Sequence, residues 1–600
     1  MAGTTIGADT GGTFTDVVDA SGAIVKVPST PHAPDRAVTD GIAALGSPGV
    51  AHLAHGTTVA TNAVLEGALA PVALVTTEGL GDVIEIGRQD RVDLYDATAR
   101  RPPPLVRREH RIEVAGRLDA HGHEVSPVDV SGLAIPDGVT AVAVCLLHAD
   151  LDHAHEQIVA QHLRARGYDV VASHEVSPEF REYERSVTTV VNAGLRPSCR
   201  DYLRRLGGVA PDVSVMTSAG GLLDATTAGE LPAALLLSGP AGGVRAAAAD
   251  ATACGYPDAV SFDMGGTSTD VCLIQDGHPA MATARHVGGY PVRFPSIDIH
   301  TVGAGGGSIA RIDAGGALVV GPTSAGAQPG PACYGRGGTV PTVTDADLVA
   351  GRIPPDARFG DMTLDVVAAR AALDGAGVSA EGVIEVVDAT MARALRTVSI
   401  ERGVDPAGLA LVCFGGAGGL HACALADALG MPAVVVPPRA GVLSAVGLLA
   451  SPPRRSVVHS RRFPADHSTL AEERRAAADE VRALLASAEV TVHVMLDCRY
   501  VGQSHELTVP DVAAFHIEHE RRNGFARPDA PVEVVAVRGT AVGSPALTVD
   551  ELPVPDHRVG VAGVQGPAVV AEPDATVWVA SGWRADVGPL GSLVLTRESS

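Results

Sequence analysis

Short apolar runs and longer alanine-rich segments alternate along this chain of 600 residues. Runs such as "APVALVTT", "VTAVAVCLL" and "LALVCFGGAG" have the length and composition of buried strands. The alanine-rich segments 152–166, 385–402 and 469–489 have the apolar spacing of helices. An alternation of strands with helices predicts stacked α/β layers.

Two segments interrupt this pattern. "ARRPPPLVRREH" at 99–110 breaks any helix and predicts an exposed connection or an edge hairpin. "LASPPRRSVVHSRRF" at 449–463 combines prolines with four arginines and predicts a domain boundary. Short strand-like runs beyond it predict a smaller, β-rich domain. Because the chain is longer than one core usually serves, two or three domains are expected.

The charge balance narrows the class of partner. The chain has 45 basic and 69 acidic residues, for a net charge of -24. This balance argues against nucleic acid and against an anionic membrane surface as partners. A nucleotide remains compatible with it, provided that a divalent cation and backbone N–H groups screen the phosphates.

The cysteines and the N-terminus bear on the compartment. The eight cysteines are scattered, with no Cys-x-x-Cys pair and no zinc-ligand spacing, which is typical of small buried residues in a reducing compartment. The first residues, "MAGTTIGADTGG", lack the basic and apolar regions of a signal peptide, and no apolar run has the length of a membrane span. A cytoplasmic protein is expected.

One pattern, Asp-x-Gly-Gly-Thr-x-Thr-Asp-Val, occurs twice, at 9–17 and 263–271. Each copy predicts a strand, a tight glycine turn and a second strand. The paired glycines let a phosphate approach main-chain N–H groups closely, and the threonines add hydroxyl donors. Asp9 and Asp263 end the first strand of each copy, where a carboxylate can hold Mg²⁺ through water. Two ordinary glycine hairpins are the alternative, but the matched pair favours two hairpins that clamp one polyphosphate.

A third glycine cluster, "LVCFGGAGGLHA" at 411–422, predicts a strand, a glycine turn and a helix. Such a turn can lie flat under a base or ribose, whereas close helix–strand packing is the alternative explanation. The three glycine motifs, in this order, resemble the actin-like ATPase fold of sugar kinases, Hsp70 chaperones and actin.

Longer strings resemble one branch of that fold. "HGTTVATNAVLEG", "LVTTEGLGDVIEIGRQDR", "SGPAGGV", "VGAGGGSIARID" and "CRYVGQSHEL" are similar to the hydantoinase A/oxoprolinase family over nearly the whole chain. The resemblance implies duplicated actin-like (ribonuclease H-like) domains at 1–195 and 196–452, followed by a smaller β-rich α+β domain at 453–600.

The same resemblance implies a chemistry and its cofactors, ATP and Mg²⁺. The oxygen of a cyclic amide would attack the γ-phosphoryl group of ATP, and water would then open the activated ring. Asp9 and Asp263 would hold Mg²⁺. The residues expected to contact ATP are Gly11, Gly12, Thr13 and Thr15 in the first hairpin, Gly265, Gly266 and Thr267 in the second, and Gly415, Gly416, Gly418 and Gly419 at adenosine.

Other polar residues are candidates for the base. Asp298 and His300, two residues apart before a glycine loop, could touch substrate or a metal, with an internal hydrogen-bonded pair as the alternative. His55 is a comparable candidate, although a lone histidine that ends a strand is more often structural. For Asp345 and Asp347 a helix-capping role is favoured.

Two histidine- or charge-rich helices are not expected to bind anything. His155 and His162 lie two turns apart, too far for shared coordination of a metal, so a capped surface helix is expected there. Residues 466–489 are expected to form a solvated amphipathic helix.

Three functions were considered. The first is the nucleotide-binding subunit of an ATP-dependent hydrolase for a hydantoin, 5-oxoproline or lactam, working with a hydantoinase B-like subunit. The second is the corresponding subunit of an ATP-dependent acetone or acetophenone carboxylase, with a ketone as substrate. The third is a non-enzymatic nucleotide switch of the actin or Hsp70 type. An activase for radical dehydratases is disfavoured, because no cysteine pair is placed to hold an iron–sulfur cluster.

Overall fold

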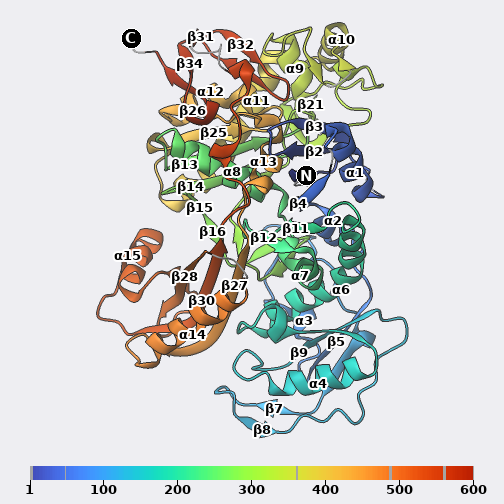
Figure 1. Ribbon diagram of the computed structural model, residues 1–600, viewed down its shortest axis with the longest axis vertical. Coiled ribbons are helices and arrows are strands. Elements are labelled where there is room, and N and C mark those ends of the chain that lie inside the picture. The colour runs from blue at the N-terminus through green and yellow to red at the C-terminus, as the bar shows by residue number, and fades with distance from the viewer. Residues whose placement is uncertain are drawn as a thin grey trace.

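The computed structural model describes residues 4–30, 32–47, 49–96, 98–359, 362–485, 489–558 and 563–598. In these residues strands and helices alternate in a mixed α/β arrangement, and most strands belong to four sheets (Figure 1). No helix in this part of the chain is both long and apolar enough to cross a membrane.

The first sheet holds the first copy of the repeated pattern. Its strands are β1 (Thr4–Thr10), β2 (Phe14–Asp19), β3 (Ile24–Pro28), β4 (Val50–Thr57), β11 (Asp212–Met216) and β12 (Leu222–Asp224). The strand order is β12-β11-β4-β1-β2-β3, with α1 (Pro34–Leu45) against β2 and β3. β1 and β2 are antiparallel, so the pattern forms the predicted hairpin with its glycines at the turn.

The second sheet holds the second copy. Its strands are β13 (Ala259–Met264), β14 (Thr269–Gln275), β15 (His278–Pro279), β20 (His300–Val302), β25 (Ala410–Phe414), β26 (Ala433–Val436), β31 (Val564–Gln565), β34 (Trp583–Val587) and β35 (Leu593–Arg597). The order is β15-β14-β13-β25-β26-β35-β34-β31, and β20 also pairs with β14. The first sheet's order β3-β2-β1-β4-β11 therefore recurs as β15-β14-β13-β25-β26, with the same strand directions.

Two helices, α8 (Gly239–Ala253) and α13 (Leu443–Leu449), connect the two sheets. They cross so closely that a Cβ on Gly447 would lie 1.8 Å from the carbonyl oxygen of Gly242. α13 also lies against β1, and α8 lies against β25, where Gly243 faces the ring of Phe414. Glycine at these crossings allows the two halves of the molecule to approach each other.

The third sheet, at the lower end of Figure 1, consists of β5 (Val72–Thr77), β6 (Arg111–Val114), β9 (Ala141–Cys145) and β10 (Asp169–Ala172) in the order β10-β9-β5-β6. Successive side chains of β9 point to opposite faces of the sheet, and a different helix covers each face. Val142 and Val144 share a core with α4 (Ala154–Ala165), whereas Ala141 and Ala143 share one with α6 (Glu182–Leu206). Both faces are covered, as expected for a parallel sheet of apolar strands.

The fourth sheet contains β27 (Arg454–Pro464), β28 (Val490–Tyr500), β29 (Leu507–Val509) and β30 (Val532–Gly543), with α14 (Thr469–Ala483) and α15 (Val512–Asn523). A buried ion network anchors it to the N-terminal part of the chain. Arg538 on β30 contacts Asp497 on β28 at 2.7 Å and Glu179 at 2.6 Å, and Arg293 contacts Glu179 at 2.8 Å.

Further helices and strands surround these sheets. They are α2 (Val59–Leu65), α5 (Ser173–Val176), α7 (Ala225–Glu230), α9 (Val343–Val349), α10 (Val366–Ala376), α11 (Ala380–Val398), α12 (Gly418–Leu429), β19 (Ser296–Ile297), β21 (Ser308–Ile312), β22 (Leu318–Ser324), β32 (Ala568–Ala571) and β33 (Thr576–Val579).

The expected domain boundaries do not coincide with the sheets. Residue 195 lies inside α6, and the first sheet takes β11 and β12 from beyond it. In the expected C-terminal domain, the strands between 454 and 543 form a separate sheet and β32 pairs with β33, whereas β31, β34 and β35 extend the second sheet, where Leu593 and Leu595 are buried in its core. Strand pairing across hundreds of residues is not visible in the local pattern that suggested the boundaries.

Helix predictions agree with the structure in place and differ at the ends. The segment 152–166 contains α4, 385–402 contains most of α11 and a 3-10 turn at Ile400–Arg402, and 469–489 contains α14, with 486–488 outside the described residues. α4 is not purely a surface helix: His155 is buried, and its Nε2 lies 2.8 Å from Glu124. The segment 99–110 is an exposed connection that ends in a single 3-10 turn.

Candidate active site

The two glycine hairpins place four aspartates in matching positions. Asp9 lies opposite Asp16 across β1 and β2, and Asp263 lies opposite Asp270 across β13 and β14. In each pair the side chains share a face of the sheet, because directly opposed residues project to the same side. The internal repeat therefore extends from sequence to side-chain placement.

The first hairpin turn leaves main-chain donors free. The carbonyl oxygen of Gly11 accepts a 2.7 Å hydrogen bond from the hydroxyl of Ser29. In a trans peptide the C=O and N–H groups point in opposite directions, so the N–H of Gly12 points away from Ser29. Among the described residues, no hydrogen bond uses the N–H of Gly12 or Thr13. The Thr15 hydroxyl is buried and lies 3.0 Å from the Ser29 hydroxyl, so it orders the turn from within.

The turn of the second hairpin also leaves main-chain donors free, but other residues hold it. The carbonyls of Gly265 and Gly266 accept hydrogen bonds of 3.0 and 2.7 Å from the N–H groups of Gly306 and Gly307. The N–H groups of Gly266 and Thr267 must then point away from this glycine run. They take part in no hydrogen bond in the described part of the chain.

The glycine run 305–307 belongs to one of the strings that resemble the family, and the sequence alone predicts no role for it. A Cβ on Gly305 would lie 2.6 Å from the carbonyl oxygen of Gly265, and one on Gly307 would lie 2.9 Å from that of Gly266. Only glycine allows the run to lie against the turn, which is the signal that could have indicated its function.

The charges of the two hairpins act on one another. Burial, and then the charge of Asp16, raises the pKa of Asp9 to about 7. Burial, followed by the charges of Asp270 and Asp9, raises the pKa of Asp263 to about 8. Lys26 lies 2.8 Å from Asp16 and partly offsets this repulsion. Two carboxylates that repel each other in a desolvated setting form a donor set suited to a divalent cation.

The third glycine motif lies directly beside the second hairpin. Gly415 has a φ of 78°, and a Cβ there would lie 2.4 Å from Oδ1 of Asp263. The N–H of Ala417 donates to the carbonyl of Met264 at 3.0 Å. Gly416 is exposed, with open space where a Cβ would be, whereas a Cβ on Gly419 would lie 2.6 Å from the carbonyl of Thr576 on β33. Gly415 thus faces the second hairpin, Gly416 is open to solvent, and Gly419 serves close helix–strand packing. For Gly418 a Cβ would make ordinary contacts.

His55 has a structural position. It is fully buried, its Nδ1 lies 3.0 Å from the carbonyl of Ala8 on β1, and its Nε2 lies 2.6 Å from the hydroxyl of Tyr202 on α6. Burial lowers its pKa to about 4, so the ring is neutral at physiological pH. The preference for a structural histidine agrees with this geometry.

His300 does not share a face of the sheet with the hairpin aspartates, and Asp298 is held by an ion pair. On β20, Thr301 lies opposite Asp270, and its hydroxyl donates to Oδ1 of Asp270 at 2.5 Å. His300 is opposite Val271 and therefore on the other face of the sheet. Asp298 forms a 2.7 Å ion pair with Arg402. The sequence analysis missed Thr301, because only the pairing of β20 with β14 brings it to Asp270.

Asp345 and Asp347 differ in role. Asp345 forms a capping box with Thr342 at the start of α9, as predicted. Asp347 is fully buried and does not cap; its Oδ2 lies 3.4 Å from Nε2 of His421 on α12, whose Nδ1 lies 2.6 Å from Asp388 on α11. A buried imidazole between two carboxylates therefore joins three helices next to the third glycine motif.

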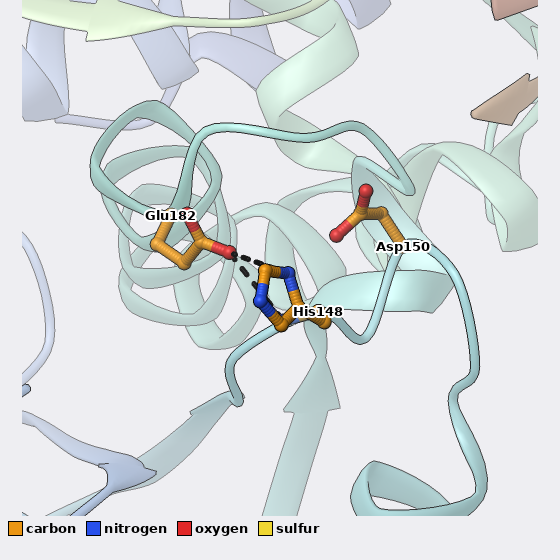
Figure 2. A group of neighbouring side chains, drawn as sticks. All are labelled: His148, Asp150 and Glu182. Atoms are coloured by element: carbon orange, nitrogen blue, oxygen red, sulfur yellow. Dashed lines mark hydrogen bonds and ion pairs between the residues drawn. The ribbon is translucent and has the colours of Figure 1, made fainter. Parts of the chain in front are cut away.

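His148, Asp150 and Glu182 form a group of potential metal ligands, and Figure 2 shows Glu182 directed at the His148 ring. Their nearest ligand atoms all lie within 4.8 Å of one another. However, Nη1 of Arg185 lies 2.5 Å from Asp150, and its Nη2 lies 3.6 Å from Glu182. The guanidinium already compensates these carboxylates, so the group is better explained as an internal ion network than as a cation site.

The residues at the hairpins fit ATP with a divalent cation. Four unbonded N–H groups suit phosphate oxygens, the repelling aspartates suit the cation, and the open position at Gly416 leaves room for an adenosine moiety. An isolated hairpin would supply only part of this set.

Family models match most of the chain. The hydantoinase/oxoprolinase N-terminal region matches residues 5–167, and hydantoinase/oxoprolinase matches residues 185–457. The chain is 32% identical to the caprolactamase subunit alpha of Pseudomonas jessenii, over 98% of this chain and 99% of that protein. It is 34% identical to 5-oxoprolinase 1 of Arabidopsis thaliana, over 73% of this chain and 40% of that protein.

A third relative and two solved structures extend the comparison. The acetophenone carboxylase gamma subunit of Aromatoleum aromaticum is 34% identical, over 73% of this chain and 66% of that protein. The crystal structure of ATP-dependent caprolactamase from Pseudomonas jessenii matches with a TM-score of 0.85 and 31% identity, over 99% of this chain and 100% of that one. A nucleotide-free acetone carboxylase structure matches with a TM-score of 0.74 and 24% identity over the full length of both chains, and shares the fold.

Proposed function

Because this chain belongs to the hydantoinase/oxoprolinase family, we propose that it is the nucleotide-binding subunit of an ATP-dependent cyclic amide hydrolase. The substrate class is a hydantoin, 5-oxoproline or a lactam. The observation that carries this proposal is the pair of hairpins, each with two unbonded N–H groups and an aspartate whose pKa is raised to about 7 or 8.

The two halves that carry the hairpins are duplicated actin-like domains. The recurrence of one strand order around both hairpins supports this assignment. So does the position of the third glycine motif directly after β25, next to the second hairpin. In such an arrangement each half supplies one phosphate-binding turn.

ATP, when bound, supplies the phosphoryl group that turns the oxygen of a resonance-stabilised amide into a leaving group. The N–H groups of Gly12, Thr13, Gly266 and Thr267 orient the phosphates, with the hydroxyls of Thr13 and Thr267 beside them. Thr15 acts indirectly, because its hydroxyl holds Ser29. Gly415 and Gly416 lie under adenosine, and Gly418 and Gly419 set the start of α12 behind them.

Asp9 and Asp263 would hold Mg²⁺, which would offset the charge of the phosphates. The raised pKa of each lets it keep a proton near pH 7 in the free protein and release it when a cation arrives.

Asp298 and His300 stay candidates for contact with substrate. Of the two, His300 has the freer side chain, since Asp298 is already paired with Arg402. His300 lies one residue and Asp298 three residues from Thr301, which bonds to Asp270, so a change at either position can also act through the second hairpin.

A hydantoinase B-like subunit completes the enzyme. Two relatives are named as subunits, alpha and gamma, of larger enzymes. The likeness to the acetophenone carboxylase gamma subunit favours one second candidate, a ketone carboxylase subunit. A non-enzymatic nucleotide switch has no comparable support.

The test is ATP consumption across hydantoins, 5-oxoproline, other lactams and ketones, with and without the product of the adjacent gene. We expect a cyclic amide to stimulate ATP consumption. Ring opening of that amide should occur only when the second protein is present. Stimulation by a ketone with bicarbonate would instead identify the carboxylase, and no stimulation by any compound would leave the nucleotide switch.

A further inference from the structure

Two arginines from different parts of the chain lie over one glycine turn. Arg245 is on α8, and Arg454 is the first residue of β27. The turn between β11 and β12 contains Gly220 and Gly221. A Cβ on Gly220 would lie 3.1 Å from Cδ of Arg245, and one on Gly221 would lie 3.0 Å from Cδ of Arg454. Each arginine stem therefore packs on one of two adjacent glycines, and the charge of Arg245 acts on Arg454.

Neither arginine has an acidic partner among the described residues. Arg454 donates from Nη1 to the carbonyl of Ala219 at 3.0 Å, while its Nε is buried without a hydrogen-bond partner. Arg245 makes no hydrogen bond or ion pair in the described part of the chain. Burial, and then the charge of Arg245, lowers the pKa of Arg454 to about 10.

The next residue in the chain provides a contrast. Arg455 forms a 2.7 Å ion pair with Asp224, the last residue of β12 in the β11–β12 hairpin. Most other partly buried arginines of the molecule are likewise paired with carboxylates, such as Arg293 and Arg538 with Glu179. Arg285 and Arg439 also lack an ion pair in the described residues, but each donates to two backbone carbonyls, whereas Arg245 makes no hydrogen bond there and Arg454 makes one.

Two neighbouring, partly desolvated positive charges without a counter-ion are unfavourable, and a small anion between them would remove the cost. A guanidinium group presents a planar fork of N–H donors that matches the oxygens of a carboxylate or phosphate. We propose that Arg245 and Arg454 bind a small oxyanion at this junction, supplied either as free phosphate or as a free carboxylate.

This site is separate from the hairpins. Ala241 and Val244, on the turn of α8 before Arg245, belong to a buried apolar cluster with Ile297 and Leu448. Leu448 lies next to Gly56, and a Cβ added to Gly56 would also lie 2.5 Å from Oδ1 of Asp9. The apolar cluster thus stands between the arginine pair and the aspartates. A bound anion would connect α8 of the second half to the β11–β12 turn and to the fourth sheet.

The experiment measures anion binding by the full chain at constant ionic strength, with chloride as the balancing ion. Inorganic phosphate and acetate are titrated separately by calorimetry into the wild type, R245Q, R454Q and the matched control R455Q. We expect saturable binding of at least one anion, weakened at least tenfold in R245Q and in R454Q and unchanged in R455Q. Binding of phosphate alone, or of acetate alone, identifies which class of oxyanion the site takes.

The proposal would be overturned if the wild type showed no saturable binding, or if R455Q lost as much affinity as the test variants. It would also be overturned if binding survived in both R245Q and R454Q, which is the result expected for phosphate bound at the hairpins. Thermal unfolding adds a second readout that needs no ligand. In chloride buffer without phosphate or carboxylate, R245M and R454M should unfold at the same temperature as the wild type or above it, because each removes an uncompensated charge. A clear fall in both would mean that the arginines already have internal partners, and would also overturn it.

Discussion

Asp9 raises the pKa of Asp263, although the two residues belong to different sheets and different halves of the chain. The effect adds to burial and to the charge of Asp270, and it brings the pKa of Asp263 to about 8. Each half of the molecule thus depends on the other for its electrostatics. A cation placed between them would relieve both.

The first prediction concerns this pair. Asp9→Asn and Asp263→Asn keep the side-chain volume but remove a cation ligand, so each should reduce substrate-dependent ATP turnover by about 100-fold or more. Each also removes a repulsive charge, so the free energy of unfolding at pH 8 should stay the same or rise. Coupled ATPase assays and urea denaturation measure the two effects. Near-normal turnover in both variants would contradict the clamp.

The second prediction compares two adjacent glycines. Gly415→Ala places a Cβ 2.4 Å from Oδ1 of Asp263 at a φ of 78°, so it should lower the unfolding temperature and abolish turnover. Gly416→Ala meets nothing within 4 Å and is the matched control for folding. It should unfold like the wild type and raise KM for ATP, because its methyl group would lie on the adenosine side. An unchanged KM would remove Gly416 from the nucleotide site.

The third prediction uses Asp250, a fully buried residue on α8. Burial raises its pKa to about 6, although Ser592 donates to its Oδ1 at 2.7 Å. A carboxyl group whose pKa is higher in the folded state than in the unfolded state lowers the free energy of unfolding of the protein as the pH rises from about 4 to 6. Asp250→Asn should therefore stabilise the protein above pH 6, by about 1–3 kcal/mol, and change little below pH 4.

Urea denaturation at pH 4 and pH 8 measures this difference. Asp374→Asn, at an exposed residue of α10, is the control and should show no pH-dependent gain. A destabilised Asp250→Asn at pH 8 would mean that the carboxylate is better compensated than its contacts indicate.

The fourth prediction concerns His421. Burial alone would lower its pKa, but the charges of Asp347 and Asp388 raise it to about 10. The stabilisation by the charged ring is complete below pH 6.5 and is lost as the pH rises through 10. His421→Asn leaves two carboxylates without their partner and should cost on the order of 3–5 kcal/mol at pH 7. It should also raise KM for ATP more than it lowers kcat, because α12 follows the glycine motif.

The pH dependence separates this role from simple packing. Between pH 7 and pH 10 the wild type should lose more stability than His421→Asn does. His121→Asn, at an exposed residue, should follow the wild type. Parallel curves for the wild type and His421→Asn would show that the ring carries no charge in the folded state.

Local features of the fold and site could be predicted from the sequence. The strand–turn–strand shape of both repeats follows from glycines between apolar runs, and the positions of α4, α11 and α14 follow from helical spacing. The capping role of Asp345 follows from its place three residues after Thr342. These features depend on residues within one or two turns of each other.

The sequence by itself therefore determined the α/β class, the two hairpins and the family resemblance. Only the tertiary structure decided which side chains meet. Pairing of β20 with β14 placed Thr301, and not His300, on the face of Asp270. Approach of distant helices and turns joined His421 to Asp347 and Arg245 to Arg454, and the return of β35 completed the second sheet. Such contacts depend on strand register and long-range packing, which period and composition do not encode.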